Sequence, residues 1–98
     1  MDMENKVRQI RELVEAKREK FARVSDEVWA VPELYFHETK SAAILIKALK
    51  EEGFEVQEGV DGIPTAFIGT WGSGKPVIGI LGEFDALPRL SQEAGCWE

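Results

Sequence analysis

Cysteine and histidine are nearly absent from this 98-residue sequence, which contains one of each. A single cysteine, Cys96, cannot form an internal disulfide, and no second thiol or histidine stands near it at metal-ligand spacing. We expect Cys96 to be a buried or incidental thiol in a reducing, cytoplasmic compartment. The only histidine, His37, cannot build a metal cluster alone, because three or four ligands are usual. It is expected as a partly exposed residue at the entry to a helix.

Two further deficits restrict the partners. No apolar run reaches the roughly 18 residues that a membrane span needs, and the N-terminus is too charged for a signal peptide. Positive charge is also in deficit, with 12 lysines and arginines against 18 aspartates and glutamates, a net charge of -6. Nucleic acid and anionic membranes both require a basic surface. Neither is expected as a partner.

The composition is that of a folded chain, with 44% hydrophobic and 31% charged residues. These values are typical of globular proteins and not of disordered tails. Ninety-eight residues suffice for one small domain or for part of a larger one.

Two helices are predicted in the first half of the chain. Residues 4–31 carry apolar side chains at steps of three, four or seven, which predicts one long amphipathic helix that Pro32 stops. A second helix is expected over residues 38–52, with Gly53 as its C-terminal cap. Its predicted buried face consists of Ala42, Leu45, Ile46 and Leu49.

Three strands are predicted after the helices, over residues 54–60, 65–71 and 76–84. The third is almost wholly apolar, as expected of a strand covered on both faces. The predicted fold class is α/β, two N-terminal helices followed by three strands. Two helices do not supply cover for both faces, so we expect the chain to be the beginning of a longer protein.

Two loops resemble functional sites, but for each of them an ordinary structural turn is the favoured interpretation. The stretch GTWGSGKP, residues 69–76, follows most of the phosphate-loop pattern, but Pro76 replaces the metal-binding hydroxyl and a strand is predicted where a helix is required. A turn between two strands is favoured. The connection over residues 31–41 offers a recognition loop; a turn whose Leu34 and Phe36 fill the core is favoured instead.

The most specific feature is a pair of acids, Glu83 and Asp85, at the end of the third predicted strand. Alternate residues of a strand face the same side, where carboxylates suit cation binding or can orient a metal-bound histidine. In the other interpretation, Glu83 pairs with a lysine or caps a loop, and Asp85 caps the following turn. The residue pattern alone leaves both open.

Three motifs together, PELYFHE, GIPTAFI and GKPVIGILGEFDALP, resemble the N-terminal part of the metal-dependent aminoacylase/carboxypeptidase family of amidohydrolases, in particular its p-aminobenzoyl-glutamate hydrolase-like branch. The resemblance runs from about Lys6 to Cys96. It implies a zinc-peptidase-like α/β catalytic domain with two divalent metals, zinc or manganese, and a glutamate that activates a metal-bound water. It also implies a homodimeric full-length enzyme that hydrolyses the amide bond of an acylated amino acid, a short peptide or an aminobenzoyl-glutamate-like substrate.

Only Asp85 carries over directly, as the family aspartate that orients a metal ligand without touching the metal. Glu83 occupies the position where other relatives have a histidine, and its role stays open. Arg89 replaces the glycine expected after DALP, and the C-x-H motif of this branch is absent around Cys96. The resemblance therefore implies no metal ligand within the chain itself.

We expect residues 1–98 to form the N-terminal fragment of a catalytic domain, inactive alone because one Glu-x-Asp pair cannot hold two metals. The alternative is a stand-alone, non-catalytic module that dimerises through the long N-terminal helix. The apolar stripe from Val7 to Val28 has nearly the spacing of a two-helix seam.

Overall fold

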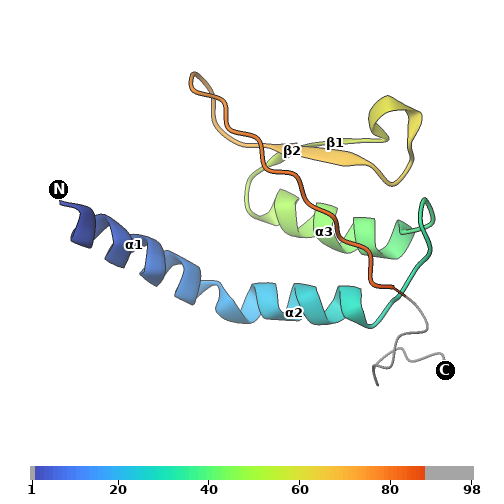
Figure 1. Cartoon of the computed structure of the whole chain (residues 1–98), viewed down its shortest axis with the longest axis horizontal. Helices are drawn as coiled ribbons and strands as arrows, with labels where there is room; N and C mark the ends of the chain where they lie inside the picture. The colour runs from blue at the N-terminus through green and yellow to red at the C-terminus, as the bar shows by residue number, and fades with distance from the viewer. Residues whose placement is uncertain (1, 88–98) are drawn as a thin grey trace.

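Three helices and two strands make up residues 2–87, the part of the chain that the computed structural model describes (Figure 1). They follow one another as α1 (Met3–Ala16), α2 (Arg18–Trp29), α3 (Thr39–Glu51), β1 (Glu55–Glu58) and β2 (Phe67–Thr70), with a short 3-10 turn at Val60–Gly62 between the strands. The fold is mixed α/β, as predicted. Among these helices, none has the length and apolar character required to cross a bilayer.

The predicted single N-terminal helix is wrong in one respect, because it is divided at Lys17. The backbone there leaves the helical region (φ -108°, ψ 10°), and the Lys17 N–H donates to the carbonyl of Val14 at 3.1 Å. No proline or glycine lies near the break, so local sequence gives no sign of it. The cause lies in tertiary packing: α2 packs on α3 and Lys17 pairs with Glu52, whereas α1 continues beyond the end of α3 (Figure 1).

The prediction for the second helix is confirmed to within a residue at each end. Gly53 adopts φ +91°, and its N–H donates to the Lys50 carbonyl at 3.1 Å, which closes the last turn as expected of a C-terminal glycine. Ala42 is buried and the larger side chains of the predicted face are half-buried.

The first two predicted strands form an antiparallel hairpin in which Val56 pairs with Gly69 and Glu58 with Phe67. Helix α3 sits directly on this hairpin. A Cβ atom added to Gly69 would lie 3.0 Å from Leu49 Cδ1, closer than side chains normally approach. The absence of a side chain at Gly69 therefore lets α3 approach the strand closely.

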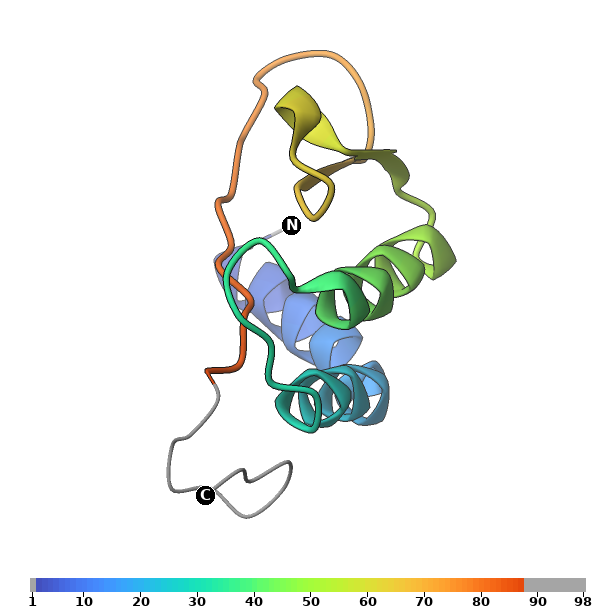
Figure 2. The same ribbon diagram turned by 90° about the vertical axis from the view of Figure 1, so that its right-hand side faces the viewer.

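Helix α3 lies between the hairpin and α2, as the two views show together (Figure 2). The arrangement is thin, with principal extents of 52, 33 and 19 Å. Within residues 2–87, the buried residues are few and small: Ser41, which is fully buried, and Ala42, Ala48 and Thr65. The interior is therefore a contact zone around α3 rather than a large hydrophobic core.

The third predicted strand is not formed, since residues 71–87 adopt neither helix nor strand. From the reversal that follows β2, at the end of the hairpin opposite its β1–β2 turn, the segment runs back toward the connection between α2 and α3 (Figure 1). Its apolar side chains are the most exposed of their kind, with Val77 at 86%, Ile80 at 94% and Leu81 at 90%. A strand requires a neighbouring backbone to accept and donate its hydrogen bonds, and none of the described residues supplies one to residues 76–84.

Two lysines, Lys17 and Lys20, form ion pairs with glutamates at the C-terminal end of α3. Lys17 Nζ lies 2.6 Å from Glu52 Oε1, and Lys20 Nζ lies 2.7 Å from Glu52 Oε2 and 3.1 Å from Glu51 Oε1. The hydrogen bonds from Lys17 and Lys20 lower the pKa of Glu52, and those to Glu52 and Glu51 raise the pKa of Lys20. These ion pairs therefore stabilise the fold at pH values above the lowered pKa of Glu52 and below the raised pKa of Lys20. The stabilisation is lost when Glu52 is protonated or Lys20 is deprotonated.

Replacing Gly53 by alanine should lower the free energy of unfolding by about 1 kcal/mol, because a Cβ atom is unfavourable at positive φ. Urea denaturation would measure the change. Gly79→Ala is the matched control, since Gly79 has open space around it and no positive φ. An equal loss in both variants would contradict the role assigned to Gly53.

Substituting Glu52→Gln should lower stability and weaken its dependence on salt, because the lost interaction is electrostatic. Thermal unfolding in low salt and in about 1 M sodium chloride would show it. Glu15→Gln is the control: among residues 2–87, Glu15 forms an ion pair with Arg18 alone, on the exposed surface, where such pairs contribute little. The assignment fails if the two variants respond to salt alike.

Candidate functional site

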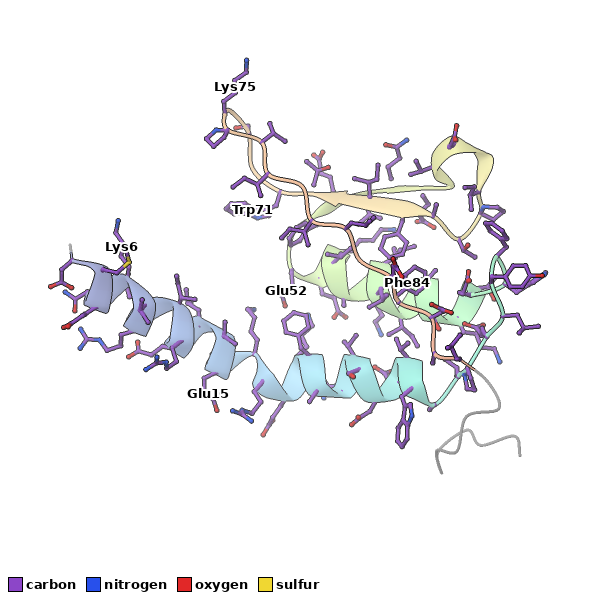
Figure 3. The ribbon with its side chains drawn as sticks, viewed as in Figure 1. Lys6, Glu15, Glu52, Trp71, Lys75 and Phe84 are labelled. Atoms are coloured by element: carbon purple, nitrogen blue, oxygen red, sulfur yellow. The ribbon has the colours of Figure 1, made fainter. Side chains whose placement is uncertain are left out.

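The two acids singled out in the sequence lie in the irregular segment that follows β2. Burial alternates along it: Phe84 and Ala86 are half-buried, whereas Glu83 and Asp85 are exposed. The Phe84 ring lies 5.6 Å from that of Phe67, which holds the segment against β2 (Figure 3). Both acids are therefore exposed, and because no strand forms here, their common orientation stays a prediction.

Within residues 2–87, Glu83 and Asp85 have no side-chain hydrogen bond or ion pair. No group of three or more histidine, cysteine, aspartate or glutamate side chains in that part of the chain is placed to hold a metal. Two exposed carboxylates do not fit a complete binuclear centre. Arg89 and Cys96 lie outside the described residues.

A third acid near this segment, Glu33, accepts three hydrogen bonds through its carboxylate, and no sequence motif indicated it. Its Oε1 accepts hydrogen bonds from the Ser41 N–H and the Ser41 hydroxyl, each at 2.9 Å, and its Oε2 accepts one from the Lys40 N–H at 3.1 Å. These donors belong to the first turn of α3, whose N–H groups have no partner within the helix. Glu33 therefore caps α3 from six residues before its start.

A signal for this cap does exist in the sequence, but it is weak. The residue before α3 is Glu38, whose side chain accepts from the Phe36 N–H at 2.9 Å instead of capping the helix. A helix without a serine, threonine, aspartate or asparagine cap needs another acceptor. Which upstream acid supplies it depends on how the connection folds back.

The environment of Glu33 has opposing effects on its acidity. Partial burial raises the pKa of the carboxyl, but the hydrogen bonds from Ser41 and Lys40 favour the charged form and outweigh it, so the pKa lies below the usual 4.5. The stabilisation is consequently present above pH 4.5 and is lost as the pH falls through the lowered value.

The connection that carries Glu33 differs from the prediction. Leu34 and Phe36, expected to fill the core, are 55% and 63% exposed. The chain turns sharply between Leu34 and His37, whose N–H donates to the Leu34 carbonyl at 2.9 Å, and Phe36 adopts φ +61°. This turn directs Glu33, and not the apolar residues, toward α3. His37 is exposed just before the helix, as predicted.

The glycine-rich stretch at residues 69–76 lies at the tip of the structure, where Lys75 points away from the helices (Figure 3). Gly72 and Gly74 adopt positive φ, as a tight reversal requires. No helix follows within the described residues, which agrees with the rejection of a phosphate loop. The prediction that this turn leads into a paired strand is wrong, because none of the described residues offers a backbone that pairs with residues 76–84.

A groove of about 340 Å³ lies between α2 and α3. Its rim carries charges of both signs, from Lys20, Arg23 and Lys47 and from Glu27 and Glu51. Lys20 and Glu51 already neutralise each other. The groove brings together no nucleophile with a base, and it does not include the acids of the segment after the hairpin.

Comparison with known proteins gives one informative result. The chain is 47% identical over 94 residues to a subunit of p-aminobenzoyl-glutamate hydrolase from Escherichia coli (strain K12). This similarity supports a hydrolase lineage. It covers 96% of the present chain but only 20% of the E. coli protein, so the chain spans about a fifth of the length of its relative. No protein-family model matches the chain, and no solved structure matches it.

Identity at this level to the E. coli hydrolase covers nearly the whole described structure, including the connection with Glu33 and the segment with Glu83 and Asp85. The match therefore supports one part of the resemblance inferred from the three motifs, namely that the chain is related to a hydrolase.

Glu33→Gln should lower the free energy of unfolding near neutral pH by about 1 kcal/mol, because glutamine keeps one acceptor oxygen but loses the charge and the second acceptor. It should also flatten the decline in stability below pH 4.5, because the variant has no carboxyl at this position to protonate. Chemical denaturation at a series of pH values measures both effects. Gly53→Ala is the control, since it changes no titratable group and its loss should not depend on pH. A Glu33→Gln profile parallel to the unaltered one would contradict the prediction.

Proposed function

We propose that this chain is the N-terminal part of a metal-dependent amidohydrolase similar to p-aminobenzoyl-glutamate hydrolase, and that it has no hydrolase activity by itself. The observation that carries the proposal is the 47% identity over 94 residues to a fifth of the E. coli hydrolase subunit. In this proposal the chain contributes helices and strands to a zinc-peptidase-like catalytic domain. The whole enzyme would act in the cytoplasm as a homodimer.

The exposed apolar segment supports the proposal independently. Val77, Ile78, Ile80 and Leu81 are each more than four-fifths exposed, in a run whose composition suits a strand covered on both faces. An uncovered patch of this kind marks a surface that contacts other protein. Further chain of the same domain would supply strand neighbours and cover.

The site residues keep limited roles in this proposal. Asp85 would orient a metal ligand contributed by other residues, and the role of Glu83 is left open. Two divalent metals, zinc or manganese, would supply Lewis-acid chemistry in the whole enzyme. The substrate would be an acylated amino acid, a short peptide or an aminobenzoyl-glutamate-like amide.

The alternative of a dimerisation module receives less support from the structure. Its seam would run from Val7 to Val28, but the break at Lys17 divides that stripe. On α1 the stripe is exposed, with Ile10 at 60% and Val14 at 66%, whereas Val24 and Val28 on α2 are half-buried. A continuous two-helix seam is therefore not available to a second copy.

A chimera tests the proposal: the 94 matched residues of the E. coli hydrolase subunit are replaced by those of this chain. Assayed together with the other components of that enzyme, it should hydrolyse p-aminobenzoyl-glutamate within about 100-fold of the unaltered protein, the loss that a misplacement of about 1 Å causes. The 98-residue chain alone, given zinc or manganese, should show none. A soluble but inactive chimera, or metal-dependent hydrolysis by the chain alone, would overturn the proposal.

A further inference from the structure

Glu33 joins two parts of the structure that are far apart in the sequence. Its carboxylate accepts three hydrogen bonds from Lys40 and Ser41 at the start of α3. Its backbone N–H donates to the carbonyl of Ala86 at 3.2 Å. One residue thus contacts both the helix and the residue that follows Asp85.

Little else holds the segment that carries the acids. Residues 76–83 are exposed throughout, and within residues 2–87 the segment is attached by the Phe84–Phe67 ring contact and the Glu33–Ala86 hydrogen bond. The ring contact places the segment over β2 but leaves rotation about its own direction free. The bond at Ala86 restricts that rotation, because it holds the peptide plane between Ala86 and Leu87, which begins one residue after Asp85.

The anchor itself is held firmly. Ser41 is completely buried, and Glu33 uses both carboxylate oxygens on it and on Lys40. Charge-assisted hydrogen bonds of this kind are about twice as strong as neutral ones. Glu33 is therefore fixed relative to α3. Because its backbone N–H donates to the Ala86 carbonyl, Ala86 is held relative to α3 as well.

We infer that Glu33 is a positioning residue, which orients Asp85 by tying the backbone at Ala86 to the first turn of α3. This inference rests on the proposed function and assigns to it a residue from the other half of the chain. Glu33 itself touches no reacting atom. Its effect on catalysis follows from geometry, because carboxylates that orient a ligand act over a fraction of an ångström.

The test compares Glu33→Ala with Glu38→Ala in the chimera. Glu38 lies in the same connection and also accepts one backbone hydrogen bond, but the bond is to Phe36 and reaches neither α3 nor Ala86. Glu33→Ala should lower kcat about 10- to 100-fold with KM nearly unchanged, and Glu38→Ala should change kcat by less than about 3-fold. Glu33→Gln keeps an acceptor for Ser41 and should recover part of the loss.

Hydrogen exchange on the 98-residue chain separates this inference from the proposed function, because it needs no activity. Glu33→Ala should speed amide exchange at the start of α3 and at the backbone N–H of residue 33, which donates to the Ala86 carbonyl, and Glu38→Ala should not. An inactive unaltered chimera overturns the proposed function, and the exchange data then decide whether the tie at Ala86 exists. Faster exchange confined to α3, or equal kcat for the two alanine variants in an active chimera, overturns the inference.

Discussion

The position of α3 is the constraint that organises this structure. The helix contacts α2 on one side and the hairpin on the other, and the few buried side chains lie on it or beside it. Its two ends are held by charge: Glu33 accepts from the N–H groups of the first turn, and Glu52, just past the last turn, pairs with Lys17 and Lys20. These end contacts add to the packing of α3 against α2 and the hairpin.

The same helix links the fold to the candidate chemistry. Glu83 and Asp85 belong to a segment without regular structure, yet one hydrogen bond at Ala86 connects that segment, through Glu33, to α3. Sequence similarity to a hydrolase gives these acids a context, and the described residues show what this chain could contribute to it. Within residues 2–87 that contribution is a pair of exposed carboxylates, without a group of side chains placed to hold a metal.

The exposed segment is the clearest mismatch between composition and structure. Residues 76–84 have the apolar character of a central strand, but pairing depends on a partner's backbone and not on the segment's own composition. Among residues 2–87 no such partner is present, and the side chains of Ile80 and Leu81 face solvent. Such exposure is expected of an apolar segment that is covered by other parts of a larger domain, as the proposed function implies.

The local elements could be predicted from the order of the residues alone. Periodicity located α3 and the two strands of the hairpin, and Gly53 marked the helix end, because these features depend on residues close together in the chain. Three features came instead from packing between elements: the break at Lys17, the exposure of Leu34 and Phe36, and the attachment of Glu33 to α3 and Ala86. No periodic pattern records which distant group completes a hydrogen bond or an ion pair, so the sequence could not reveal them.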